Sequence, residues 1–196
     1  VLMQRRFLLT GEIENDIWPI PITMDLNGSL RTLLLDSKEK SIEAQDLTTL
    51  KVNVNHTGFY RVYYDGLYDR VWGSELSNLD RWGILSDAFA FLIAGMMSFT
   101  DYLLMLNKYL EEEDYLPALE ASDQLSFLYS IMPSKIEGTS KEFHHAHLKI
   151  FVEKHGETNS MLMGIMSTRL AMVDEDYAQK LGSQFNDYAN VDPNMK

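Results

Sequence analysis

The sequence predicts a partial β-sandwich followed by an all-α domain of stacked antiparallel helix hairpins, as in HEAT and armadillo superhelices. Two observations predict this class: the period of the apolar residues changes from two to a helical period near residue 72, and the links between helices are short. With 45% hydrophobic residues among 196, the chain can fill sizeable cores. We therefore expect a small sandwich over residues 1–72, without its first strands, and a helical-repeat-like domain over 73–196, truncated at its C-terminal end.

The strand-like part opens with an alternating stretch. Apolar residues occupy every second position of residues 18–26, which is the period of a half-buried strand. Asn27-Gly28 then predicts a tight hairpin into a second strand over residues 29–37. Because Pro21 cannot donate a backbone hydrogen bond, it should lie where one side of the strand is unpaired. Two further short strands are predicted, over residues 40–44 and 50–55.

The rest of the chain has helical periodicity with recognisable start and stop signals. Ser, Thr, Asn and Asp residues mark helix starts, and glycines and prolines mark ends. Pro133, for example, should lie beyond the end of one helix, and Gly156 should stop another. Six helices are predicted: Asn78 to about Gly95, one capped by Thr100, and residues 116–132, 140–155, 159–172 and 174–188.

Composition excludes several classes of function. The formal charge of -12 disfavours binding to nucleic acid phosphates or to an anionic membrane surface, so neither partner is expected. The absence of cysteine excludes a disulfide scaffold, a thiol nucleophile and cysteine-ligated zinc, and we expect a cytoplasmic protein. The first twelve residues lack an initiator Met and fit neither a signal peptide nor a membrane span, so we expect a piece of a longer chain.

The negative charge is concentrated in the helical part. Residues 1–72 carry 8 basic and 10 acidic side chains, whereas residues 73–196 carry 9 and 19. Two interpretations are open: the acids coat a solvated outer face of the helices, or they line a concave surface that attracts basic peptides.

One helix carries a histidine cluster, "EFHHAH". Only His144 and His147, which are three residues apart, share a helix face. The zinc-hydrolase helix needs histidines four apart with a glutamate after the first, so this spacing does not match it. We interpret the cluster as a surface histidine patch, and adventitious metal binding by these two side chains is the alternative. The sequence contains neither a phosphate-binding glycine loop nor a nucleophile-elbow serine.

The segment "NHTGFYRVYYDG", residues 55–66, carries bulky side chains at both sets of alternate positions. This pattern predicts a central strand with Phe59, Tyr60 and Val62 buried. Gly58 should supply unusual backbone angles for the preceding turn, and Arg61 should pair with a carboxylate or a carbonyl.

Downstream, the segment "LDRWGILSDAF" places charged residues at a helix start. Asp80 falls in the first helical turn, where a negative charge is favoured. The predicted structural junction between strands and helices consists of Gly58, Phe59, Tyr60, Arg61, Asp80, Arg81 and Asp87.

Three segments carry a resemblance to a known family. In order, "NHTGFYRVYYDG", "LSNLDRWGILSDAFAFLIAG" and "YLEEEDYLPALEA" resemble the C-terminal half of the gluzincin zinc aminopeptidases, the aminopeptidase N-like group. The upstream "QRRFLLTGEIENDIWPIPIT" resembles the strand pair before them. The resemblance covers roughly the first 120 residues, whereas residues after about 135 are similar only in being helical. Within the family, the chain is most similar to archaeal members that work beside the tricorn protease.

The resemblance implies a metalloprotease whose catalytic part is not in this sequence. The family's zinc helix and its Gly-x-Met-Glu-Asn strand do not occur here, so no catalytic residue and no metal ligand can be assigned, and zinc would belong to the parent enzyme. That enzyme would remove N-terminal residues from short peptides, downstream of the proteasome or the tricorn protease. This segment would contact the catalytic domain, scaffold and roof the active site, and limit access of peptide substrates.

The alternative is a stand-alone helical-repeat module for protein interaction. It would need a self-contained sandwich at its N-terminus. The length of the coding sequence upstream of Val1, and the presence or absence of the zinc helix in it, separate the two hypotheses.

Overall fold

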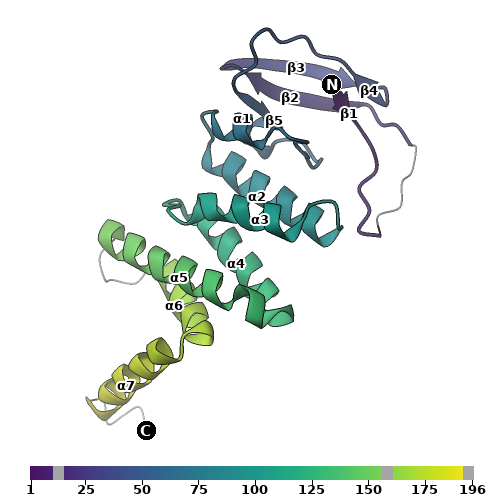
Figure 1. Cartoon of the computed structure of the whole chain (residues 1–196). Helices are drawn as coiled ribbons and strands as arrows, with labels where there is room; N and C mark the ends of the chain where they lie inside the picture. The colour runs from purple at the N-terminus through teal and green to yellow at the C-terminus, as the bar shows by residue number, and fades with distance from the viewer. Residues whose placement is uncertain (11–15, 156–160, 192–196) are drawn as a thin grey trace. The chain divides into compact units, whose positions relative to one another are not determined.

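The computed structural model describes residues 1–10, 16–155 and 161–191 (Figure 1). The strands are β1 (Leu2–Met3), β2 (Ile20–Leu26), β3 (Ser29–Leu35), β4 (Glu39–Lys40) and β5 (Leu50–Val52). The helices are η1 (Val54–His56), α1 (Tyr68–Trp72), α2 (Asn78–Ile93), α3 (Phe99–Leu106), η2 (Asn107–Tyr109), α4 (Tyr115–Ile131), α5 (Pro133–His155), α6 (Met161–Val173) and α7 (Glu175–Val191). A strand-rich N-terminal part followed by helices is thus confirmed.

The chain divides into two compact units, Val1–Leu106 and Asn107–Lys196. The first unit holds all five strands together with α1, α2 and α3, and the second holds α4 to α7. The domain limits predicted at residues 72 and 73 stay a prediction.

The first unit is built on a three-stranded antiparallel sheet with the order β3-β2-β5, and β1 pairs with β4 in a second, two-stranded sheet. The predicted hairpin is confirmed: Asn27 and Gly28 have φ values of 53° and 78°, and Leu26 pairs with Ser29. Both turn residues therefore adopt the left-handed backbone that a two-residue hairpin needs. The Asp25 carboxylate accepts the Gly28 N–H at 2.8 Å and fixes the turn.

One face of this sheet is buried, and the other is open along β3. The buried side chains come from alternate positions of the three strands, in agreement with the two-residue period. They are Ile22, Met24, Leu26, Leu35, Leu50 and Val52. On the opposite face of β3, Leu30 and Leu34 are exposed.

Hydroxyl groups start the first two long helices. Ser77 is the N-cap of α2, where its Oγ accepts the Asp80 N–H at 3.1 Å. Ser98 Oγ accepts the Asp101 N–H at 3.0 Å before the first turn of α3. The predicted caps at Asn78 and Thr100 are therefore wrong, because an earlier serine in each case reaches the orphan N–H three residues on.

In the second unit, consecutive helices from α4 to α7 contact one another, and α4 also contacts α6. Their core is apolar and comes from α4, α5 and α6. Its fully buried members include Ala118, Leu125, Leu128, Ile136, Phe143, Leu162, Met166 and Leu170.

Two details of the helix predictions are wrong. Helix α5 begins at Pro133 and not at Ser140, because a proline has no N–H to lose and is well tolerated in the first turn of a helix. Helix α1 was not predicted, since its five residues are too few to show a period. The predicted stop at Gly156, and the start of the next helix at residues 159 and 160, lie outside the described residues.

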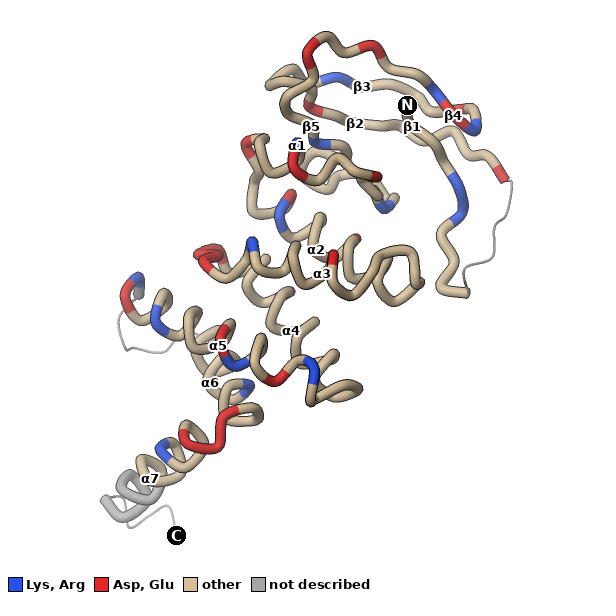
Figure 2. Tube along the Cα trace, viewed as in Figure 1, with Lys and Arg blue, Asp and Glu red and all other residues tan. Residues whose placement is uncertain are grey.

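Acidic and basic positions are interspersed along α5, whereas α7 starts with the two acids Glu175 and Asp176 (Figure 2). This arrangement favours the interpretation of the acids as part of solvated helix surfaces. Within the described ranges, no helix combines the length and the apolar character needed to cross a membrane.

Candidate functional site

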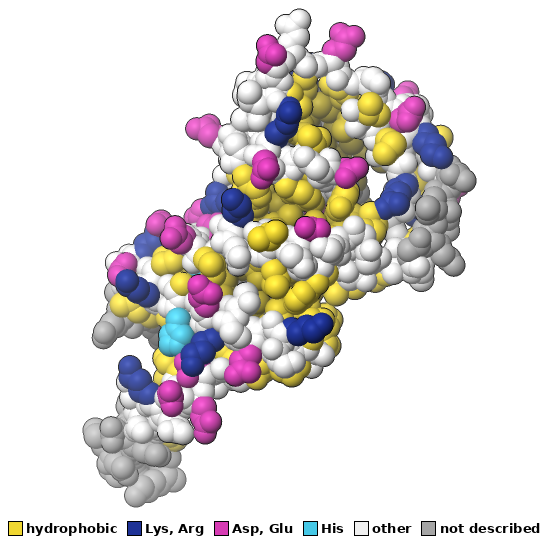
Figure 3. Space-filling view, viewed as in Figure 1, with side chains coloured by type: hydrophobic (Ala, Val, Ile, Leu, Met, Phe, Trp, Pro, Cys, Tyr) yellow, Lys and Arg dark blue, Asp and Glu magenta, His cyan; other side chains and the backbone are white. Residues whose placement is uncertain are grey.

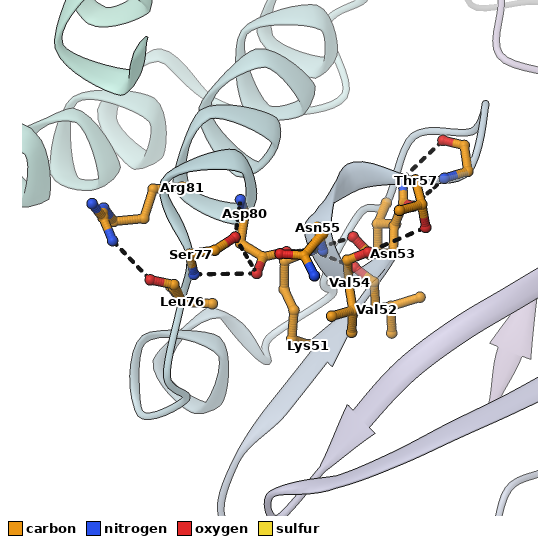
Figure 4. A network of polar contacts seen from close by, with 12 residues as sticks. Lys51, Val52, Asn53, Val54, Asn55, Thr57, Leu76, Ser77, Asp80 and Arg81 are labelled. Carbon is orange, nitrogen blue, oxygen red and sulfur yellow. Dashed lines mark hydrogen bonds and ion pairs between the residues drawn. The ribbon is translucent and has the colours of Figure 1, made fainter. Parts of the chain in front are cut away.

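In the first unit, a buried ion pair joins the sheet to α2 (Figure 4). Lys51 of β5 places its Nζ 3.1 Å from Oδ1 of Asp80 in α2, and both side chains are almost fully buried. The ammonium also donates to the carbonyl oxygens of Val52 and Asn53 at 2.6 and 2.8 Å. Burial lowers the pKa of Lys51, and the Asp80 carboxylate partly offsets this. The charge is thus paired and fully hydrogen-bonded, which is the condition under which a buried ion pair is tolerated.

Asp80 also organises the backbone on both sides of it. Its Oδ1 accepts the Asn55 N–H at 2.7 Å, and its Oδ2 accepts the Ser77 hydroxyl at 2.9 Å. Asp80 Oδ2 also accepts the Ser77 backbone N–H at 3.3 Å, and with the Asp80 N–H bonded to Ser77 Oγ this forms a capping box at the start of α2. One carboxylate therefore starts a helix, neutralises Lys51 and holds the loop after β5.

That loop, residues 53–61, is here called the Asn53 loop. The Asn53 side chain accepts the Gly58 N–H at 2.7 Å and donates to the carbonyl oxygens of Gly58 and Tyr60 at 3.0 and 3.2 Å. Asn53, Asn55 and His56 have φ values of 60°, 55° and 50°, in the left-handed region that non-glycine residues rarely adopt. The loop is thus held in an uncommon conformation by side-chain hydrogen bonds.

Gly58 is needed in this loop, but not for the predicted reason. Its φ is not positive; the positive values lie at the preceding asparagines and histidine. A Cβ at position 58 would lie 2.1 Å from the Tyr60 ring, closer than any real contact allows. Only glycine therefore permits Tyr60 to fold back over the loop.

A second carboxylate, Asp87 of α2, holds the chain beyond the loop. It accepts the Arg61 guanidinium at 3.0 Å and the Val62 N–H at 2.9 Å. Burial raises the pKa of Asp87, and the Val62 N–H and the Arg61 charge oppose that shift. The predicted pairing of Arg61 with a carboxylate is confirmed. The Arg61 guanidinium also lies 5.6 Å from the centre of the Phe7 ring, within cation–π range.

Tyr64 contacts the free side of β5. Its hydroxyl accepts the Val52 N–H and donates to the Val52 carbonyl, both at 3.0 Å. The ring is buried, and burial raises the pKa of the phenol. Both backbone groups of Val52 that point away from β2 thereby find a partner.

The predicted central strand over the "GFYRVYYD" segment is wrong, because residues 58–60 form a bend and residues 61–64 have no regular structure and pair with no strand. The backbone groups here bond to the side chains of Asn53 and Asp87, which replace a neighbouring strand. Tyr64 is buried, Tyr60 and Val62, which were predicted to be buried, are only half-buried, and Phe59 is 110% exposed. The expected burial of Phe59 is therefore wrong.

Arg81 completes the set of predicted junction residues. Its Nη1 donates to the Leu76 carbonyl at 2.7 Å, just before α2. The structure brings six of the predicted residues into polar or packing contacts at this junction, whereas Phe59 points away from it. Residues that the sequence reasoning missed are Lys51, Asn53, Tyr64 and Ser77; the Ser77-x-x-Asp80 spacing is a capping signal that could have identified the last of these.

The predicted histidine cluster lies in the second unit, and there the surface interpretation is wrong. His144 and His147 are both fully buried, and only His145 is open to solvent. Helix α5 turns His144 and His147 toward its neighbours, because residues three apart share one face. The exposed His145 lies 2.8 Å from Asp174.

The neutral His144 ring takes part in hydrogen bonds that connect three helices. Its Nδ1 donates to the Ser140 carbonyl at 2.6 Å, so Nε2 accepts the Ser122 hydroxyl at 2.8 Å. Arg169 of α6 in turn donates to Ser122 Oγ at 2.6 Å. Burial lowers the pKa of His144 to about 4, so the ring is uncharged near neutral pH. Although serine and histidine are paired, both are sealed from solvent, and no substrate could reach the hydroxyl.

The same packing leaves few ring nitrogens free to bind a metal ion. Both ring nitrogens of His144 are engaged, and His147 stacks on Phe143 with ring centres 3.9 Å apart while its Nδ1 donates to the Phe143 carbonyl. Across residues 1–10, 16–155 and 161–191, no group of three or more potential ligand side chains could hold a metal. Both polar clusters therefore position helices and loops.

Comparison with known proteins identifies relatives along the whole chain. Leucyl aminopeptidase of Saccharolobus solfataricus is 39% identical over 196 residues, which are 100% of this chain and 25% of that protein. Tricorn protease-interacting factor F2 of Thermoplasma acidophilum is 38% identical over 202 residues, 99% of this chain and 25% of the factor. Aminopeptidase M1 of Arabidopsis thaliana is 26% identical over 216 residues, 91% and 24% of the respective chains. The chain thus spans about a quarter of the length of these relatives.

The relatives are aminopeptidases and a tricorn protease-interacting factor, so the resemblance to the aminopeptidase N-like family is confirmed. Residues 49–196, which include the Asp80 and His144 clusters, match the family described as the ERAP1-like C-terminal domain. The chain belongs to the ERAP1-like C-terminal domain family.

Proposed function

We propose that this chain is the non-catalytic C-terminal part of a zinc-dependent aminopeptidase that removes N-terminal residues from short peptides. The observation that carries the proposal is the alignment with leucyl aminopeptidase along the full 196 residues, at 39% identity, within a relative four times as long. The missing zinc helix and Gly-Met-Glu-Asn strand support it from the sequence. Zinc and the catalytic groups then belong to the remainder of the polypeptide.

In this proposal the chain is a scaffold. Residues 1–72 contribute part of a β-sandwich, and residues 73–196 contribute the first hairpins of a HEAT-like superhelix that roofs the active site and limits access to short peptides. The two small sheets support the first assignment, and the successive contacts from α4 to α7 support the second. The ion pair of Lys51 with Asp80 supports a fixed connection between the strands and α2, which a roof anchored to its base requires.

The proposed partners are the catalytic domain of the same polypeptide, peptide substrates, and the tricorn protease or a proteasome that supplies them. Support for the tricorn link comes from the two relatives named tricorn protease-interacting factor F2, at 38% and 36% identity. Peptides released by such proteases are short and carry free N-termini, which are what an aminopeptidase consumes. We place the protein in the cytoplasm, where such peptides arise and where folds do not depend on disulfides.

The experiment compares the 196-residue chain with the longer polypeptide encoded by its gene. The longer polypeptide should release a chromogenic amine from amino-acid substrates and contain stoichiometric zinc, because metal-activated water needs the ligands and base that this chain lacks. The 196-residue chain should do neither. Chelator-sensitive amine release by the pure 196-residue chain would contradict the proposal, and a reading frame that begins near Val1 would favour the stand-alone interaction module.

A further inference from the structure

The Asn53 loop ends in an aromatic tip that touches nothing in its own unit. Phe59 is 110% exposed, more than any other large apolar side chain in the described residues. Single exposed apolar residues are common on protein surfaces, so exposure alone would carry little meaning. The distinctive feature is how firmly the surrounding backbone is held.

Several independent contacts fix this tip. Asn53 makes three hydrogen bonds across the base of the loop, to Gly58 and Tyr60. The buried Asp80 carboxylate holds the Asn55 N–H at 2.7 Å. Three residues before the tip adopt left-handed backbone, and each such residue costs about 1 kcal/mol or more. Buried hydrogen bonds and a strained backbone therefore hold the backbone of Phe59 in one position.

Helix α2 is also shaped to receive the loop. His56 packs edge-on against Trp82 with ring centres 4.9 Å apart. A Cβ on Gly83 would lie 2.3 Å from His56 Nδ1, so only glycine at this helical position lets the loop lie so close. The tip is thus pre-organised against a helix and not left free to move.

Pre-organisation of an exposed aromatic residue is what a docking anchor requires, because a rigid side chain loses little entropy when it enters a pocket. Aromatic residues, phenylalanine included, are enriched in the buried cores of protein interfaces. The same unit exposes further apolar side chains on the face drawn in Figure 3, near the sheet and α2. Tyr63, two residues past Arg61, is itself 41% exposed.

We propose that Phe59 is the anchor by which this unit docks into an apolar pocket on another domain of the same longer polypeptide; this rests on the proposed function. The partner domain is inferred from the length of this chain relative to that of its relatives. The matched region makes up only 25% of relatives that align with it from end to end, so most of the surface available to the tip in such a chain lies outside these residues. The chemistry required of the pocket is simple: an apolar cavity large enough for one phenyl ring.

The first test measures the exposure of the Phe59 side chain directly by hydroxyl-radical footprinting. In the 196-residue chain, Phe59 should be oxidised readily; in the longer polypeptide, that labelling should be lost. Leu30, which is 66% exposed on the outer face of β3, provides a side chain for normalising the labelling within each sample. Equal labelling of Phe59 in both proteins would overturn the proposal.

The second test is Phe59→Ala with Leu30→Ala as the matched control. In the longer polypeptide, Phe59→Ala should reduce hydrogen-exchange protection of residues 57–61 by about thirtyfold, as expected when a buried anchor is truncated. The 196-residue chain should show the same melting temperature with and without the substitution, and Leu30→Ala should change neither protein. A large loss of stability in the 196-residue chain would show that the ring packs internally and would overturn the proposal.

Footprinting and exchange do not depend on catalysis, so these results stand apart from the aminopeptidase assay. A longer polypeptide that protects Phe59 but cleaves no peptide would support the docking anchor and contradict the proposed function. If instead the 196-residue chain forms dimers that Phe59→Ala dissociates, the partner is a second copy and the proposal is overturned.

Discussion

The two buried polar clusters differ in the kind of group that they use. In the first unit, Lys51 and Asp80 are ionic and hold an irregular loop, whereas in the second unit His144 is neutral and bridges regular helices. An irregular backbone leaves N–H and carbonyl groups without ladder partners, and a charged side chain with several bonding positions can satisfy them at once. Between helices whose backbone groups are already paired, a neutral donor and acceptor is sufficient.

The difference implies that the stability provided by the Lys51–Asp80 cluster depends on charge pairing, whereas that provided by the His144 cluster depends on pH. Removing one ion in the first unit leaves its partner buried and unpaired, which is among the costliest single changes in a protein. In the second unit, the corresponding penalty appears only when acid forces a charge onto His144.

Asp80→Asn should lower the free energy of unfolding by about 3–5 kcal/mol, because it leaves the Lys51 ammonium buried without a counter-charge. Denaturant unfolding of the 196-residue chain measures the change. The matched control is Asp36→Asn, whose pair with Lys40 is exposed and should contribute only about 0–1 kcal/mol. Adding Lys51→Met to Asp80→Asn should recover part of the loss; equal effects of Asp80→Asn and Asp36→Asn would contradict the ionic role.

The second unit should lose stability between about pH 6.5 and pH 4 because of His144. The pKa of this ring is lowered from 6.5 to about 4 in the fold, so across that interval the unfolded chain binds a proton that the folded chain does not. Stability is therefore unaffected by this group above pH 6.5, falls as the pH drops, and levels off below pH 4, with a total loss of up to about 3 kcal/mol.

Unfolding curves at several pH values measure this effect, and His144→Gln provides the control because glutamine does not titrate. The difference in stability between parent and variant should change with pH over this interval. A constant difference would show that the His144 ring is not kept neutral by the fold. Burial also lowers the pKa of His147, which adds to the loss of stability in acid. Because this contribution is present in both proteins, it cancels when the parent is compared with the variant.

Alanine substitution of one helical glycine in each unit should change stability in opposite directions and by smaller amounts. Gly83→Ala should destabilise the first unit by about 1–3 kcal/mol, because the new Cβ would collide with the His56 ring. Gly138 of α5 faces open space, so Gly138→Ala should stabilise the second unit by up to about 1 kcal/mol through helix propensity. Thermal melts of both variants suffice. A stabilising Gly83→Ala would mean that the Asn53 loop does not lie against α2.

The smallest effect is expected for Phe59→Ala in the 196-residue chain, within about 0.5 kcal/mol, since the side chain makes no contact there to lose. This reverses the expectation from the sequence, where a buried Phe59 would have made the substitution severe. Denaturant unfolding, with Leu30→Ala alongside, checks it. A loss as large as that of Asp80→Asn would place the ring in the core.

The elements that local rules control could be predicted from the sequence. The Asn27-Gly28 hairpin follows from turn chemistry, and the position of Pro21 follows from its missing N–H. Although β2 is the central strand, β5 pairs only with residues 24–26, so one side of β2 has no strand partner at Pro21. The prediction about Pro21 is thus confirmed, although the strand order alone would suggest that β2 is paired on both sides along its length.

The candidate sites were less predictable because their partners lie far away in sequence. Alternation around Phe59 indicates a strand, but Asp87, some 25 residues on, supplies the carboxylate that bonds the Val62 backbone in place of a ladder. The histidine spacing alone indicates a surface patch, whereas the burial of His144 depends on Ser122 and Arg169 from two other helices. Lys51 is missed for the same reason, because no residue near it in the sequence indicates that Asp80 will be its partner.

The hydroxyl of Tyr64 has a consequence beyond stability. An outer strand such as β5 offers unpaired N–H and carbonyl groups on which another chain could build a sheet. By occupying both groups of Val52, a single phenol blocks intermolecular pairing at this residue of β5, as a covering strand would. A phenylalanine at position 64, nearly equal in bulk, would fill the same space and leave both groups of Val52 open to another strand.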